Sequence, residues 1–136
     1  MTKNNKNLLN SSLVLAFLSG LTIFSLKKWG FVEGVFGREA SPFLVYAKAS
    51  HYFMTPLFIF LMGTITHGHI KKYYDSGMEV NRRTGLTNIV CMVLLFTSGQ
   101  SLLIIGSRDI KYYAELFHLI IGSFFVLMAF IHQRKN

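Results

Sequence analysis

Four long apolar runs constrain the fold of this chain more than any other feature of its sequence. They cover about residues 8–26, 43–70, 85–105 and 112–132, and each has roughly the 20 residues that cross a 30 Å hydrocarbon layer as a helix. The connections between them are short, which favours neighbouring antiparallel helices. The sequence therefore predicts an all-α integral membrane protein, with residues 1–136 forming a single up-down four-helix bundle in contact with the lipid bilayer.

The charge of the chain is strongly basic. Lys and Arg number 14 against 6 Asp and Glu, giving a formal net charge of +8. In a soluble protein this balance would suggest a nucleic-acid partner. Here the basic residues lie between apolar runs and not along one amphipathic face, so the charge indicates membrane topology, and no nucleic-acid partner is expected.

Topology follows from the distribution of these basic residues. With four spanning helices, both termini and the connection around residues 71–84 share one side of the membrane. That side carries Lys3, Lys6, Lys71, Lys72, Arg82, Arg83, Arg134 and Lys135. The other side carries Lys27, Lys28, Lys48, Arg38, Arg108 and Lys111. The positive-inside rule then predicts both termini in the cytoplasm.

The first apolar run has an alternative interpretation as a secretory signal, because Lys3 and Lys6 precede it. We expect a helix instead, since the run is long for a signal and no A-x-A-like cleavage site follows it. Lys27 and Lys28 then lie at the far interface. The single cysteine, Cys91, excludes a disulfide framework, a multi-cysteine zinc site and covalent Cys-x-x-Cys-His haem attachment.

Histidines are the remaining residues able to bind a metal. His51 lies near the start of the second run and His67 and His69 near its end, while His118 and His132 lie near the two ends of the fourth. An ionisable side chain inside a spanning helix is expensive and is a candidate functional residue, although a single histidine could simply hydrogen-bond to a neighbouring helix.

The spacing of the histidines predicts two stacked sites. His118 and His132 are 14 residues apart, which separates them by about 40° around a helix and about 21 Å along it. His51 and His69, 18 residues apart, share nearly one angle, whereas His67 lies about 160° from His51. The rise along the helix axis, compared with that between His118 and His132, slightly favours His67. A kink at Pro56 would change both the angles and the rise.

In an up-down bundle the second and fourth helices run in the same direction. Each would carry two histidines on one face, so that at each of two depths in the membrane one imidazole from each helix faces the other. This geometry suits axial ligation of two haems by neutral histidines, whereas tetrahedral zinc needs three or four converging ligands. Small residues near the histidines would let a macrocycle approach the backbone, namely Gly20, Gly63, Gly99 and Gly122. Ordinary helix packing explains the same glycines equally well.

These residues together resemble a known family. The fourth run, HLIIGSFFVLMAFIH, has His-x3-Gly and a second His 14 positions after the first. The second run has His51, Gly63 and His69, and an Asn-Arg-Arg-Thr-Gly stretch and Thr97-Ser98-Gly99 follow. From about Ser50 to the C-terminus the chain resembles the small bis-histidine di-haem membrane cytochromes b of the cytochrome b561 and respiratory gamma-subunit type, especially a bacterial group of cytochrome-b-like proteins. The resemblance thus implies a location in a bacterial inner membrane.

This resemblance implies two non-covalent b-type haems whose metal ligands are His51, His69, His118 and His132. It also implies electron transfer across the membrane, often between quinone or quinol and a partner redox protein. His67 departs from the family pattern as an extra histidine, and could be an alternative ligand, a proton carrier or an interfacial residue with no role.

Charged and polar residues near the histidines give a second group of candidates. Lys48, Arg82 and Arg83 could bind haem propionates, or they could serve membrane orientation alone. Lys48 and Glu115 each lie three residues before a candidate ligand and could pair, or Glu115 could accept the Nδ1 proton of a ligand. Asn88 and Gln100 are expected to make interhelical hydrogen bonds and not to contact a quinone.

An electron relay is therefore the expected function, while enzyme activity of the chain on its own stays open. The alternative class is a small membrane protein without redox chemistry: a transporter, a metal-handling protein using His67 and His69, or a structural anchor subunit.

Overall fold

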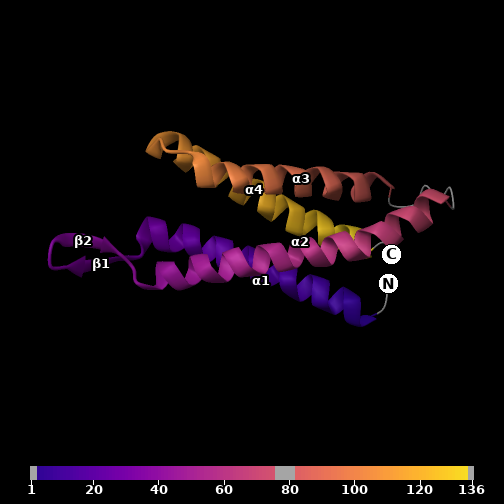
Figure 1. Cartoon of the computed structure of the whole chain (residues 1–136), viewed down its shortest axis with the longest axis horizontal. Helices are drawn as coiled ribbons and strands as arrows, with labels where there is room; N and C mark the ends of the chain where they lie inside the picture. The colour runs from indigo at the N-terminus through magenta and orange to yellow at the C-terminus, as the bar shows by residue number, and fades with distance from the viewer. Residues whose placement is uncertain (1–2, 76–81, 135–136) are drawn as a thin grey trace. The chain divides into compact units, whose positions relative to one another are not determined.

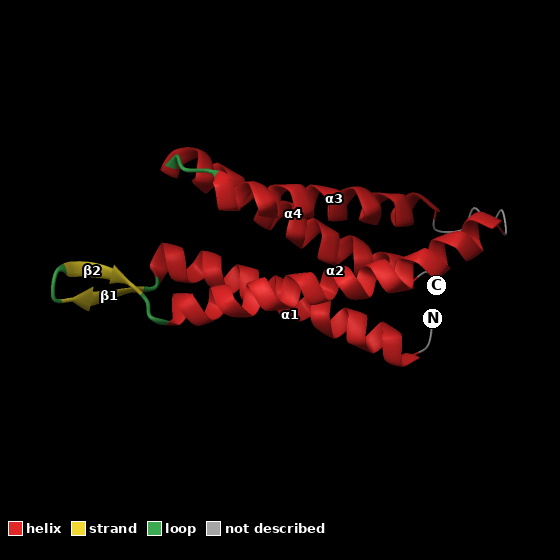
Figure 2. Cartoon of the chain, viewed as in Figure 1, coloured by secondary structure: helices red, strands yellow, loops and turns green. Residues whose placement is uncertain are grey.

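The computed structural model describes residues 3–75 and 82–134, together with their side chains except those of Lys3, Ile65, Thr66, His69, Ile70, Tyr73, Tyr74 and Arg82. Within these two ranges the chain forms four helices, shown in Figures 1 and 2: α1 (Lys3–Trp29), α2 (Phe43–Asp75), α3 (Arg82–Ile104) and α4 (Arg108–Arg134). Each predicted apolar run coincides with one of them to within a few residues at either end, which confirms the four helices. α2 is a single helix through Pro56.

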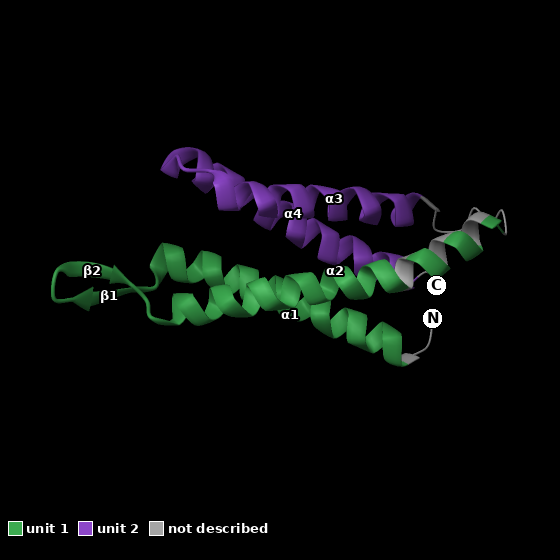
Figure 3. Cartoon of the chain, viewed as in Figure 1, with its two compact units in different colours: residues 1–77 green, residues 78–136 purple. Residues whose placement is uncertain are grey.

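The chain divides into two compact units, residues 1–77 and residues 78–136 (Figure 3). In the first, α1 packs against α2, and in the second, α3 packs against α4. Each unit is thus an antiparallel pair of helices. The arrangement of all four helices in one up-down bundle stays a prediction of the sequence.

A β-hairpin joins α1 to α2, where the sequence predicted only a connection. Its strands β1 (Phe31–Gly34) and β2 (Gly37–Ala40) pair antiparallel, with Phe31 opposite Ala40 (Figure 2). Gly37 has a φ of 108°, in the region where side chains are strained, and it follows the two turn residues. The amide of Ser41 donates to the carbonyl of Gly30 at 2.8 Å and closes the base of the hairpin. The fold is therefore not purely α-helical.

Local signals account for the helix ends around this hairpin. The amide of Gly30 donates to the Leu26 carbonyl at 3.0 Å, where α1 ends, as is common for a glycine after the last helical turn. The Ser41 hydroxyl accepts a hydrogen bond from the amide of Phe43 at 3.3 Å and caps the start of α2. Lys27 and Lys28 lie in the last turn of α1, where the helix dipole favours cations.

Few side chains are buried within either unit. The buried apolar residues of the described ranges are Leu9, Leu13, Ala47 and Phe58 in the first unit and Cys91 and Phe125 in the second. Most other large apolar side chains are exposed on the helix pairs. By length and composition, α1, α3 and α4 are each apolar enough to cross a membrane. Exposed apolar surface on such helices is what contact with a lipid bilayer requires.

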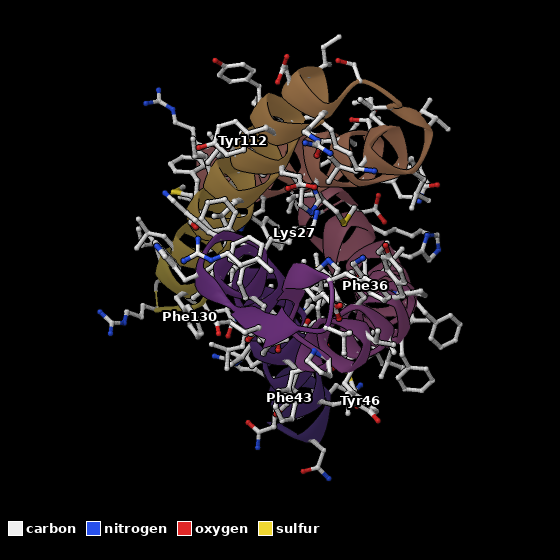
Figure 4. The ribbon with its side chains drawn as sticks, turned by 90° about the vertical axis from the view of Figure 1, so that its left-hand side faces the viewer. Lys27, Phe36, Phe43, Tyr46, Tyr112 and Phe130 are labelled. Atoms are coloured by element: carbon white, nitrogen blue, oxygen red, sulfur yellow. The ribbon has the colours of Figure 1, made fainter. Side chains whose placement is uncertain are left out.

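Exposed aromatic side chains lie near the end of α1 and near the starts of α2 and α4. Phe43 and Tyr46, at the start of α2, are 70% and 72% exposed and extend outward from the ribbon (Figure 4). Trp29 at the end of α1 and Tyr113 in the second turn of α4 are exposed to a similar degree. Aromatic residues in such positions are typical of helices that end at a membrane–water interface.

Candidate metal-ligating histidines

His51 is held against α1 by two hydrogen bonds to the same ring nitrogen. Its Nδ1 atom lies 3.0 Å from the Ser19 hydroxyl oxygen and 3.0 Å from the Ala16 carbonyl oxygen. The Ser19 hydroxyl donates its own proton to the Ala16 carbonyl at 2.9 Å. Ser19 is buried and the ring itself is half-buried, so this part of α2 is fixed to α1 by an interaction between polar groups.

Gly20 allows this approach. A Cβ atom on Gly20 would lie 3.1 Å from Cε1 of His51 and 3.4 Å from its Nδ1, and the first distance is tighter than most real contacts of such an atom. The imidazole therefore occupies the space that any other residue at position 20 would fill with its side chain.

His118 repeats the arrangement in the second unit. Its Nδ1 atom lies 2.8 Å from the Ser98 hydroxyl oxygen on α3, and that hydroxyl donates to the Leu95 carbonyl at 3.2 Å. The next residue is Gly99, where an added Cβ would lie 3.2 Å from Cε1 of His118. A serine followed by a glycine on one helix thus faces a histidine on the next helix, as at His51.

His132 shows the same pattern with threonine in place of serine. Its Nδ1 atom lies 2.8 Å from the Thr84 hydroxyl oxygen, and an added Cβ at Gly85 would lie 3.5 Å from Cε1 of His132. Ser98 follows Thr84 by 14 residues and His132 follows His118 by 14. Since both helices advance by four turns between the two contacts, the α3–α4 pair presents two equivalent histidine sites about 21 Å apart.

For the remaining predicted site residues, the structure gives only the exposure of some side chains. The side chains of His69 and Arg82 lie outside the described residues. His67 is exposed, as is Arg83, whereas Lys48 and Glu115 are half-buried. Lys48 belongs to the first unit and Glu115 to the second, so their pairing stays a prediction.

Two other expectations concern buried polar groups. The Asn88 side-chain oxygen, expected to hydrogen-bond between helices, is buried without a partner among the described residues. Gly63 has no atom within 4 Å of an added Cβ, so within its own unit it leaves room beside α2. In the part of the chain that the structure describes, no three His, Cys, Asp or Glu side chains gather at one point.

Sequence reasoning missed Ser19 and Thr84 as histidine partners, although both carry a recognisable signal. The chain has four Ser-Gly or Thr-Gly dipeptides, and three of them face a histidine across a helix pair. The fourth, Ser76-Gly77, lies outside the described residues. A hydroxyl followed by a glycine marks both residues, and for Thr84 the dipeptide also recurs at Ser98 with the 14-residue spacing of His118 and His132.

Comparisons of the chain with protein-family models, with curated proteins and with solved structures find no match. The resemblance to bis-histidine membrane cytochromes b therefore stays a prediction of the sequence. What the chain does is inferred from its own residues.

Proposed function

We propose that this protein is a membrane-embedded, di-haem b-type cytochrome that relays electrons across a bacterial inner membrane, with both termini in the cytoplasm. His51, His69, His118 and His132 are the proposed iron ligands. The proposed exchange partners are quinone or quinol and a partner redox protein. The protein's part is to hold the ligands, to keep their rings neutral and to set the polarity around them.

One observation carries the proposal: of the four proposed ligands, the three whose side chains are described share one setting. Each ring is bound through Nδ1 to a hydroxyl on the preceding helix at 2.8–3.0 Å, beside a glycine. Histidines that bind metals almost always have the second ring nitrogen hydrogen-bonded in this way, because the bond fixes the orientation of the ring and raises its basicity. A histidine that served only helix packing would not need the same setting three times.

The donor set fits haem better than a protein-only metal site. Imidazoles in pairs suit the two axial positions of haem iron, whereas zinc requires three or four ligands at one point. Within the second unit the two histidines are separated by 14 residues of one helix, so they serve different centres. When bound, haem supplies a one-electron couple, whose potential depends on its ligands and their hydrogen bonds.

Three basic residues are proposed to bind the haem propionates. Charge-assisted hydrogen bonds to the propionates would come from Lys48, Arg82 and Arg83. Lys48 lies one helical turn before His51, and Arg83 lies directly before Thr84, the hydroxyl partner of His132. Both are therefore close in the chain to a proposed haem level.

A spectrum of the purified full chain tests the proposal. We expect a b-type α-band in the reduced-minus-oxidised difference spectrum and two haems per chain by pyridine haemochrome assay. Absence of the α-band in protein purified from haem-replete cells would refute the function. One haem per chain would remove one of the two proposed sites.

Single histidine variants test which ligands share a haem. Because His51 and His118 lie near the same membrane level in the predicted bundle, His51→Ala and His118→Ala are each expected to remove the same haem and spare the other. Low-temperature difference spectra distinguish the two centres. His67→Ala serves as the control and should leave both haems bound. Loss of different haems from the two variants would contradict the pairing.

A further inference from the structure

We infer that Ser98 and Ser19 are positioning residues: their hydroxyls accept the Nδ1 proton of His118 and His51, which places the ligating lone pair on Nε2 and sets the haem potential. The inference rests on the proposed function for its last step only. The direction of the hydrogen bond at His51 follows from the contact of its ring with a backbone carbonyl.

The direction is clearest at His51. A carbonyl oxygen has no proton to give, so in the 3.0 Å contact between Nδ1 of His51 and the Ala16 carbonyl the ring nitrogen must be the donor. The Ser19 hydroxyl directs its own proton to that same carbonyl at 2.9 Å. Its oxygen therefore accepts from Nδ1 as well, and the neutral ring carries its proton on Nδ1.

At His118 the direction is inferred by likeness to His51. The Ser98 hydroxyl lies 3.2 Å from the Leu95 carbonyl, one turn earlier in α3, as the Ser19 hydroxyl lies 2.9 Å from the Ala16 carbonyl. A hydroxyl has one proton and two lone pairs. With that proton directed to the carbonyl, the serine oxygen accepts from Nδ1 of His118 in their 2.8 Å contact, and the neutral ring carries its lone pair on Nε2.

Two consequences follow for a bound metal. The rings are held in the tautomer that ligates through Nε2 before any metal arrives, so no rearrangement of protons is needed on binding. Donation from Nδ1 also makes the imidazole a stronger electron donor to the metal. A stronger donor stabilises the oxidised form of iron, so each hydroxyl is expected to lower the potential of the haem that its histidine binds.

The two serines are not equivalent. After Ser19→Ala the Ala16 carbonyl still accepts the Nδ1 proton of His51, so the tautomer survives. After Ser98→Ala the 2.8 Å hydrogen bond from His118 is lost. Ser19→Ala is therefore expected to change the potential little.

A redox titration of the full haem-loaded chain gives the first test. We expect Ser98→Ala to shift the reduced-to-oxidised ratio of one haem about tenfold toward the reduced form at a fixed ambient potential, which is about 59 mV for a one-electron couple. Ser98→Thr should keep the wild-type potential, since it retains a hydroxyl and the Thr84 hydroxyl makes the same contact with Nδ1 of His132. Ser101→Ala, which removes a hydroxyl that donates to the Thr97 carbonyl on the same helix, is the matched control.

Unchanged potentials in Ser98→Ala would overturn the inference. If the Ser98→Ala variant loses a haem, the Ser98→Thr variant decides between the two roles. A haem bound at the wild-type potential in Ser98→Thr would support the positioning role of the hydroxyl. Loss of the haem in both variants would assign Ser98 to packing alone.

Nitrogen NMR of the haem-free full chain in lipid nanodiscs, labelled at histidine nitrogens, gives a test that needs no haem. His51 and His118 are expected as Nδ1–H tautomers at a pH where the rings are neutral. Ser98→Ala should give His118 a mixture of tautomers. An Nε2–H tautomer at His118 would overturn the inference. A chain that binds no haem but shows the Nδ1–H tautomers would refute the proposed function and leave the hydrogen-bond assignment intact.

Discussion

A glycine lies beside each of the three described histidine rings, and at two of them an added methyl group would crowd the ring. The gap between an added Cβ and Cε1 of the facing histidine is 3.1 Å at Gly20, 3.2 Å at Gly99 and 3.5 Å at Gly85. The first two are tighter than an ordinary van der Waals contact, and the third is not. The three glycines therefore differ in how strictly they are required.

This difference gives a prediction at the scale of one residue. Gly99→Ala should push the ring of His118 away from Ser98 and reduce haem retention about 10- to 100-fold, as loss of a ligand-orienting group typically does. Gly85→Ala should retain its haem, because the added methyl group lies 3.5 Å from Cε1 of His132. Haem content after dialysis against a haem-binding competitor measures both. Equal retention by the two variants would contradict the argument.

The sequence was more informative about the histidines than about their partners. Helical periodicity on one chain segment is enough to place His118 and His132 on one face. The Ser-Gly and Thr-Gly dipeptides mark candidate hydroxyls, but the pairing of Ser98 and Thr84 with these histidines depends on the register between two helices, which periodicity does not fix. That register is seen in the packing of α3 against α4.

At the scale of elements, the apolar runs predicted the helices well and the first connection poorly. Every predicted helix is observed, and the observed bounds differ from the predicted ones by at most five residues at an end. The hairpin was missed because its strands have four residues each, too few for an alternating pattern to stand out. Its turn also lacks the Asn-Gly or Asp-Gly signal of a typical two-residue turn.

Gly37 gives a prediction about this hairpin. Because its φ is 108°, Gly37→Ala should cost about 1–2 kcal/mol in local stability. A loss of about 1.4 kcal/mol corresponds to tenfold faster exchange of the hairpin amides with solvent deuterium. The Ser41 amide, bonded to the Gly30 carbonyl, is the probe. Val35→Ala is the control, since its side chain is 92% exposed and its loss should leave exchange nearly unchanged.

At the scale of the whole molecule, the topology predicted from charge can be tested with the described ends of the helices. In a Cys91→Ser background, Phe36→Cys places a thiol at a hairpin position that is 95% exposed. A membrane-impermeant thiol reagent should label it in intact spheroplasts. Arg134→Cys, at the end of α4, should be labelled only after lysis.

Labelling of both variants in intact spheroplasts would place the hairpin and the C-terminal end of α4 on one side and contradict an even number of spans. Labelling of the Arg134→Cys variant alone would reverse the predicted orientation. The even number of spans depends on α2, whose sequence combines apolar residues with Pro56, His67 and His69. The charge count alone could not decide these points, since it gives only a bias of eight basic residues against six.

The self-contained nature of each helix pair has a consequence for assembly. His51 is anchored by Ser19 within the first unit, and His118 and His132 by hydroxyls within the second. The first half of the chain can therefore order His51 as α1 and α2 pair, while α3 and α4 are still being synthesised, and the second half can order His118 and His132 without help from the first. The conformational entropy of those rings is then lost before the proposed haems bind, so the haems would meet preorganised ligands and bind more tightly.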